Sequence, residues 1–244
     1  DLVISDYEPV TARAARRQGI PCVGIGHQYA FSFPVPLRGG NLLSRTILQR
    51  FAPVTIPVGL HWHHFDQPIL PPIVDLAHGL ASRGDTERRV LVYLPFEDQD
   101  ALLPLFRQFP HYEFYIYAPG QRWHDDGHLH TRPLSRDGFQ QDLIDSHWVI
   151  CNAGFELISE ALQLGKRIMA KPLRGQIEQL ANAAALAFWF DCEPVAPRIS
   201  YPDVATALAR WIYGGCVETV ASLSDQLWRE TDRGRGSWKM GQVA

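Results

Sequence analysis

Short apolar runs alternate with amphipathic segments along most of the chain. Continuous apolar stretches of strand length predict strands at residues 89–96, 112–118, 148–152 and 167–171. Apolar positions at helical spacing predict helices at residues 98–108, 136–145, 154–164 and 176–189, with a further helical region over 202–229. This alternation is typical of an α/β domain in which helices cover both faces of a doubly wound parallel sheet.

The first part of the chain shows the same pattern on a smaller scale. Residues 2–5 and 20–25 are predicted strands and residues 9–19 the helix between them, which together make a βαβ unit. Residues 31–86 are rich in proline and carry little helical pattern beyond 41–50. We therefore expect the following segments: the remainder of a first domain at 1–56, an interdomain connection at 57–88, a second domain at 89–230 and a tail at 231–244. The chain opens on Asp1 directly before a strand, so we expect that an N-terminal region precedes it.

Composition and charge argue against several classes of protein. The 244 residues carry a net charge of −3 with a pI near 6.4, whereas nucleic-acid binders are normally basic. No stretch of about 18 apolar residues occurs, so we expect a soluble protein. The cysteines lie far apart without disulfide or metal-site spacing, which favours a reducing compartment such as the cytoplasm.

One strand-to-helix corner has the features of an anion site. The stretch VICNAGFELISEAL, residues 149–162, leaves a predicted strand through Asn152, Ala153 and Gly154 and then enters a helix. The start of a helix presents unpaired N–H groups and about half a positive charge, and small residues let an anion approach them. Asn152 is a helix-capping type, and Glu160, about two turns on, could accept hydrogen bonds from both ribose hydroxyls. A capped helix with a solvated Glu160 would explain the same residues without a ligand.

The residues after this corner extend the pattern over a longer span. The chain carries, in order, Gly154, Glu160, Gly165, Pro172, Glu178-Gln179 and Asn182-Ala183. This arrangement resembles the donor-site motif of nucleotide-sugar glycosyltransferases of the GT-B fold, which include plant UDP-glycosyltransferases and the bacterial enzyme that forms lipid II. It is most similar to a less characterised bacterial and archaeal branch of that group. The resemblance implies an α/β fold of two Rossmann-like parallel-sheet domains, the first of them incomplete in this chain.

The resemblance also assigns roles to individual residues. The diphosphate would lie on Asn152, Ala153, Gly154 and Phe155, and the ribose would lie on Glu160. The donor sugar would contact a group of polar side chains, Gln176, Glu178, Gln179 and Asn182. The uracil base would be recognised by the backbone of residues 132–135, which include Arg132 and Leu134, with Phe139 nearby. The plant motif has His in place of Asn152, has Pro in place of Arg167, and is two residues shorter between Pro172 and Glu178.

The opening of the chain resembles the last part of the acceptor-side domain of the same enzymes. In those enzymes an Asp after this strand commonly supports a catalytic His, and Asp6 holds that position. The partner His would lie upstream of this chain, and His27 is the alternative base or an acceptor-binding residue. Asp6 could instead be an acid placed at a helix N-terminus for the helix dipole, and His27 could be a loop or capping residue.

Two His- and Asp-rich stretches carry the ligand types of a zinc or nickel site. LHWHHFD (60–66) and HDDGHLH (124–130) both fall in predicted loops, the second within a loop at 119–131. Neither has a metal-site spacing, so we interpret both as solvated polar loops and expect no metal. Glu97 and Asp98 follow the first strand of the second domain, where their charges would repel a diphosphate, so we expect them to point away from it.

These features together predict a metal-independent, inverting glycosyltransferase. It would move a hexose or N-acetylhexosamine from a UDP-sugar, as substrate rather than cofactor, to a hydroxyl of a glycan, lipid or small molecule. A nucleotide-sugar hydrolase or 2-epimerase of the same fold is one alternative, and a non-catalytic sugar-nucleotide binding module is another. The stretch LWRETDRGRGSWKM near the end would tolerate peripheral contact with the inner face of a membrane, although a helix packed on the first domain explains it equally well.

Overall fold

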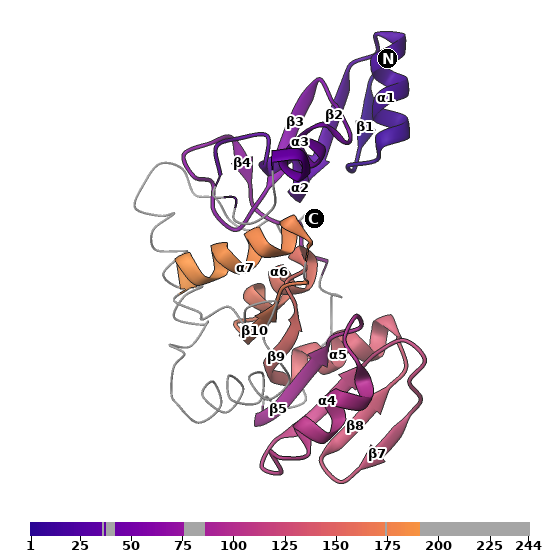
Figure 1. The fold of residues 1–244 in the computed structure, drawn as a ribbon, viewed down its shortest axis with the longest axis vertical. Helices are drawn as coiled ribbons and strands as arrows, with labels where there is room; N and C mark the ends of the chain where they lie inside the picture. The colour runs from indigo at the N-terminus through magenta and orange to yellow at the C-terminus, as the bar shows by residue number, and fades with distance from the viewer. Residues whose placement is uncertain (36, 38–41, 76–85, 174, 191–244) are drawn as a thin grey trace.

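The computed structural model describes residues 1–35, 37, 42–75, 86–173 and 175–190 (Figure 1). The helical region expected at 202–229 and the tail expected at 231–244 lie outside these residues. Within the described ranges the chain forms two parallel sheets, one in each expected domain.

A four-stranded parallel sheet forms the first domain, in the order β1-β2-β3-β4. Its strands are β1 (Val3–Ser5), β2 (Cys22–Gly26), β3 (Ile56–Leu60) and β4 (Ile69–Leu70). Helix α1 (Pro9–Gln18) joins β1 to β2, so the predicted βαβ unit is confirmed. Two further helices follow β2, α2 (His27–Ala30) and α3 (Leu42–Arg50).

The first domain extends further along the chain than its composition suggests. Residues 57–88 are expected to connect the domains, yet β3 and β4 fall largely within this range and pair with the first sheet. The prolines mask the strand pattern here, and β4 lies at the edge of the sheet, where short strands are tolerated. The described part of the connection therefore begins after Leu70.

The second sheet has six strands in the order β10-β9-β5-β6-β8-β7. The strands are β5 (Thr86–Tyr93), β6 (Glu113–Tyr117), β7 (His124–Asp126), β8 (Leu129–Arg132), β9 (Ser146–Asn152) and β10 (Arg167–Lys171). All pairs are parallel except β7 with β8. If the five parallel strands are numbered in chain order, with β5 as strand 1 and β10 as strand 5, their order across the sheet is 3-2-1-4-5. This is the strand order of a Rossmann sheet.

The expectation of a loop at residues 119–131 is wrong. This stretch contains β7 and most of β8, which form an antiparallel hairpin at the edge of the sheet. Strand β8 is held by parallel pairing with β6, from Phe114↔Leu129 to Tyr117↔Arg132. The alternation of Leu129 and Thr131 with His130 fits a half-exposed strand, which a search for continuous apolar runs does not detect.

Helices cover both faces of the second sheet. They are α4 (Gln99–Phe106), α5 (Arg136–Asp145), α6 (Phe155–Gln163) and α7 (Ile177–Phe190), close to the predicted ranges. One core contains Leu91, Val149 and Ile158, and the other contains Val92, Ile150 and Phe106. Alternate residues of one strand therefore enter opposite cores, which is why the strands are apolar throughout.

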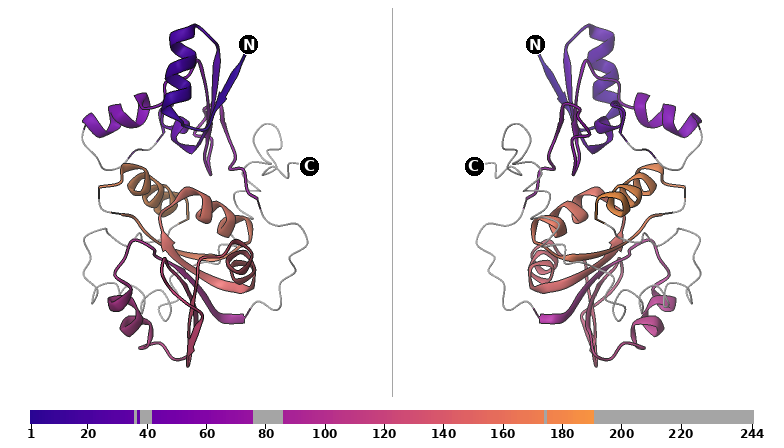
Figure 2. Two further views of the ribbon diagram at one scale, coloured as in Figure 1. Left: turned by 90° about the vertical axis from the view of Figure 1, so that its right-hand side faces the viewer. Right: turned by 90° about the vertical axis from the view of Figure 1, so that its left-hand side faces the viewer.

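Helices α6 and α7 lie between the two sheets in all the ribbon views (Figures 1 and 2). Ala181 of α7 packs in one buried cluster with Phe31 and Leu48 of the first domain, and Ile177 packs against it. The face that the second domain turns toward the first is therefore made by its two C-terminal described helices.

Because Ile158 is fully buried against β5 and β9, we expect Ile158→Ala to lower the free energy of unfolding by about 2–5 kcal/mol. Urea unfolding followed by circular dichroism measures this. Val10→Ala, at a position that is 73% exposed on α1, is the control and should change stability by less than about 0.5 kcal/mol. A cost below about 1 kcal/mol for Ile158→Ala would contradict the described core.

Candidate functional site

The order of the second sheet places a topological switch point at the carboxyl ends of β5 and β9. These strands are neighbours, but the chain leaves β5 toward β6 on one side and reaches β9 on the other side. The segments that follow β5 and β9 therefore diverge, and ligands of open α/β sheets bind at such a switch point. Tyr93 pairs with Cys151 there, and Asn152 ends β9 one residue later.

The corner after Asn152 presents the start of α6. Gly154 is the N-cap residue, with φ −73° and ψ 142°, and no side chain of the described residues caps the helix. A Cβ added at Gly154 would meet no heavy atom within 4 Å, so the described structure leaves space beside it. The first N–H groups of α6 therefore have no capping side chain among the described residues.

Asn152 does not cap α6, although its residue type suggested that role. Its side-chain amide donates instead to the carbonyl of Lys171 on β10, at 3.1 Å. Its Oδ1 atom is buried and has no hydrogen-bond partner among the described residues. Asn152 therefore links β9 to β10 at the carboxyl ends of the strands. Its Oδ1 atom remains an unsatisfied buried acceptor, which destabilises the fold unless a hydrogen-bond donor reaches it.

A cation that the sequence analysis missed lies near this corner. The Lys171 ammonium pairs with the Glu97 carboxylate, and both side chains are largely buried. Lys171 is the register partner of Asn152, so the pair lies at the carboxyl edge of the sheet. The expectation that Glu97 points away is therefore wrong, and its charge is neutralised at the edge instead. Asp98 does turn away, because its carboxylate caps α4 by accepting from the Asp100 N–H.

Glu160 lies on the half-buried side of α6, with a pKa well above its usual range. Burial raises the pKa of Glu160 to about 7, and the Glu156 and Asp75 carboxylates act in the same direction. The Arg136 guanidinium at the start of α5 opposes them. A carboxylate in this setting gains from a hydrogen-bond donor, which would restore its ionised form.

The residues proposed to recognise the uracil base lie at the end of β8, in the loop after it and in α5. Arg132 is buried, with its guanidinium 2.7 Å from the Asp125 carboxylate and over the Trp123 ring. Its charge is therefore used within the β7–β8 hairpin. Leu134 is 52% exposed in the loop that follows, and Phe139 packs edge-on against Tyr93.

The proposed sugar-binding residues on α7 already have protein partners in this conformation. Glu178 accepts a hydrogen bond of 3.1 Å from Gln28 of the first domain. Gln179 is buried and accepts from the Leu173 N–H at 2.9 Å, while Gln176 is exposed. Asn182 is fully buried and donates to the Ala153 carbonyl at 3.0 Å. The structure thus brings Asn182 to the corner, whereas Glu178 faces the domain interface.

Asp6 and His27 follow adjacent strands of the first sheet. Glu8, not Asp6, caps α1, since its carboxylate accepts from the N–H groups of Val10 and Thr11. Asp6 is exposed, and its carboxylate lies 3.1 Å from the place that a Cβ of Gly26 would occupy. Glu8 thus supplies the cap of α1, and Asp6 lies two residues before it.

His27 begins α2 and is only 4% exposed. Its Nδ1 lies 2.9 Å from the Leu60 carbonyl and its Nε2 lies 2.7 Å from Oδ1 of Asn182. Helix α2 reaches this depth because Gly59 has no side chain: a Cβ there would lie 2.5 Å from the Cα of Ala30. His27 is therefore an interdomain contact, and both of its nitrogens are engaged.

The stretch LHWHHFD is not a solvated loop as expected. His61 is 2% exposed, and Trp62 donates from its indole N–H to the Ser159 hydroxyl of α6 at 2.8 Å. Burial lowers the pKa of His61 well below its usual range, and the neighbouring His27 adds to the effect. The aromatic residue among the histidines was the available signal, because a Trp in a loop is seldom left in water.

The described residues contain no group of three or more His, Cys, Asp or Glu that could hold a metal. His130 of the second His-rich stretch lies between the Asp125 and Glu113 carboxylates, at 2.8 Å from each. The histidine is thus used in side-chain pairing across the edge strands. No helix of the described part of the chain is long and apolar enough to span a membrane.

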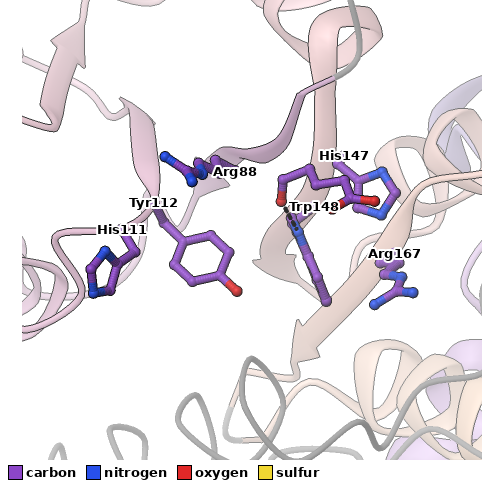
Figure 3. Close-up of a pocket in the computed structure, with 7 residues that line it drawn as sticks. Arg88, His111, Tyr112, His147, Trp148 and Arg167 are labelled. Carbon is purple, nitrogen blue, oxygen red and sulfur yellow. Dashed lines mark hydrogen bonds between the residues drawn. The ribbon is translucent and has the colours of Figure 1, made fainter.

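A separate pocket of about 430 Å³ lies at the amino ends of the strands of the second sheet, opposite to the Asn152 corner (Figure 3). It is lined by residues at the amino ends of the strands, Glu87, Arg88, His111, Tyr112, His147, Trp148 and Arg167. The seven residues of β9 place this edge roughly 20 Å from the Asn152 corner, at about 3.3 Å per residue. The pocket is therefore distinct from the candidate site.

Comparison with known proteins gives the family. The model of the family described as glycosyl transferase family 1 matches residues 1–192. The chain belongs to this family. Among curated proteins, none matches it.

Solved structures agree with this family 1 assignment at the level of the fold. MurG of Acinetobacter baumannii is 16% identical, with a TM-score of 0.61, covering 93% of this chain and 69% of that one. A UDP-glucosyltransferase of Polygonum tinctorium is 12% identical, with a TM-score of 0.61, covering 94% and 70%. SnogD of Streptomyces nogalater is 17% identical, with a TM-score of 0.56, covering 95% and 69%. The predicted GT-B fold is confirmed.

The raised pKa of Glu160 predicts a pH-dependent stability. An acid whose pKa is higher in the folded state than in the unfolded state favours folding at low pH, and this advantage is lost as pH rises toward and through about 7. We expect Glu160→Gln to be more stable than the parent at pH 8, by on the order of 1 kcal/mol once solvent screening is allowed for. The two should differ little at pH 4.5. Thermal unfolding at both pH values measures this, and an equal difference at the two would contradict the burial of a titrating Glu160.

Proposed function

We propose that this family 1 chain transfers a hexose or N-acetylhexosamine from a UDP-sugar to an acceptor hydroxyl, with inversion at the anomeric carbon. The observation that carries the proposal is the open, uncapped start of α6 at the switch point of the second sheet. A nucleotide diphosphate carries its negative charge where such a helix end offers N–H groups. Membership of the family supports the reaction class.

The diphosphate would lie over Gly154, with its oxygens accepting from the first N–H groups of α6. Gly154 has no side chain and open space beside it, so an anion could approach the start of α6 at close range. Lys171 is held by Glu97 at the same edge and would add positive charge if the pair opened. The nucleoside would then extend toward α5, where Glu160 could accept from the ribose hydroxyls and Leu134 could contact the base.

The sugar would project toward the first domain. Glu178 faces that domain already and is bonded to Gln28 there, so a sugar hydroxyl would compete for its carboxylate. Gln176 is exposed nearby, and Gln179 and Asn182 would keep the following backbone in place. These four residues are assigned to the sugar by their resemblance to the donor-site motif of GT-B enzymes.

The chemical step would be one in-line displacement. The acceptor oxygen forms a bond to the anomeric carbon while the bond from that carbon to the diphosphate oxygen breaks, and the electron pair leaves with UDP. A base on the side of the first domain takes the acceptor proton, and Asp6 stands where the supporting carboxylate of that base would be. The helix amides stabilise the charge that develops on the departing diphosphate, so we propose that no metal is needed.

Substitution of Gly154 tests the proposed phosphate position without disturbing the core. Gly154→Val should fold, because its backbone angles are ordinary for valine and a Cβ meets nothing within 4 Å. We expect UDP binding to weaken at least about tenfold, which is about 1.4 kcal/mol, because the side chain covers the N–H groups. Calorimetric titration of UDP measures this, with Gly154→Ala as a graded control of intermediate effect. Unchanged UDP affinity in the folded valine variant would place the diphosphate elsewhere.

The choice of reaction is tested by following the donor. With a panel of UDP-sugars and hydroxyl acceptors, we expect UDP release that depends on the acceptor and is unchanged by excess EDTA. TDP-sugars belong in the same panel, because the rhamnosyltransferase SpnG is known in complex with thymidine diphosphate. Release without any acceptor would instead favour a hydrolase, and nucleotide binding without turnover would favour a binding module. Loss of turnover in EDTA, restored by a divalent cation, would refute metal independence.

A further inference from the structure

Two aromatic side chains of the first domain pack against Phe155 at the start of α6. The His27 ring stacks on the Phe155 ring with centroids 3.8 Å apart and planes at 6°. Trp62 stacks on the same Phe155 ring at 5.2 Å, and its N–H bonds to Ser159 one turn further on. Ser159 in turn donates to the Phe155 carbonyl at 2.6 Å. The residue directly after Gly154 is therefore fixed by the other domain.

A second link reaches the residue directly before Gly154. His27 Nε2 lies 2.7 Å from Oδ1 of Asn182, and the amide of Asn182 donates to the Ala153 carbonyl. Asn182 and Ala153 are both fully buried. His27 therefore contacts both flanks of the glycine, one through a stacked ring and the other through a single intervening side chain.

Both ring nitrogens of His27 lie next to hydrogen-bond acceptors. Because the amide of Asn182 donates to Ala153, its Oδ1 can only accept from Nε2, and the Leu60 carbonyl can only accept from Nδ1. A neutral ring has one N–H and satisfies one of these acceptors, whereas a protonated ring satisfies both. The titratable groups that face His27 are Glu178 of α7 and His61 after β3. Burial lowers the pKa of His27, while the Glu178 carboxylate opposes that shift.

We propose that His27 is a positioning residue that couples the first domain to the amides of the Gly154 corner. The proposal rests on the proposed function, in which those amides receive the diphosphate. It replaces the expectation of a catalytic base, because both nitrogens of His27 are engaged and the ring is covered by Phe155. When the first domain contacts α6, His27 fixes Phe155 by stacking and Ala153 through Asn182. The N–H groups of the corner then keep one orientation.

His27→Phe removes the two hydrogen bonds of His27 but keeps an aromatic ring at this position to stack on Phe155. The ring can still lie on Phe155, but both hydrogen bonds are lost. We expect the amides of Ala153 and Gly154, which donate to the Lys171 and Asn152 carbonyls, to exchange with deuterium about tenfold faster than in the parent, and UDP to bind about tenfold more weakly. His124→Phe, at an exposed position on β7, is the matched control and should change neither value.

Asn182→Ala serves as a second variant, since it cuts the link to Ala153 and leaves His27 in place. Faster exchange in both variants, with UDP bound by the parent, supports the bridge and the site together. If both variants exchange faster but the parent binds no UDP, the bridge is supported and the proposed function is refuted. A parent that binds UDP, with unchanged exchange and affinity in both folded variants, would overturn the positioning role.

Discussion

The arrangement depends on the unpaired N–H groups at the start of α6. A helix must satisfy these groups with a side chain, water or a ligand, and most helices use a side chain. Here α1, α4 and α5 follow that rule through Glu8, Asp98 and Ser135. Helix α6 begins at the switch point of the sheet with glycine as its N-cap instead. The short helix α2, with Gly26 as its N-cap, also lacks a side-chain cap, but α6 is the uncapped helix that starts at the switch point, where an anion would be useful.

Leaving that corner open has a structural consequence. Without a capping side chain the first turn of α6 needs another support, and the first domain supplies it through His27 and Trp62 on Phe155. The two domains are thus joined where the donor would bind, rather than only through the apolar cluster of Phe31, Leu48 and Ala181. A change in how the domains meet would reach the N–H groups directly.

The sequence predicted the second domain well because its strands are buried on both faces and its helices have clear ends. Helix α5 was predicted at its observed bounds, since Ser135 caps it and apolar positions mark one face. Strands β3, β4 and β8 were missed because their residues are polar or follow prolines, and pairing with neighbours holds them in place. The strand-to-helix corner at Gly154 was predicted, whereas Asn182 was assigned to the donor sugar and its bond to Ala153 was not predicted. The link between His27 and Asn182 joins residues 155 positions apart, and no local pattern could indicate it.

The most direct test of the account is a crystal structure of the chain with UDP bound. The account predicts diphosphate oxygens within about 3.2 Å of the backbone nitrogens at the start of α6, with the ribose hydroxyls at Glu160. A nucleotide bound elsewhere, for example in the pocket lined by Arg88 and Arg167 at the opposite edge of the sheet, would contradict it.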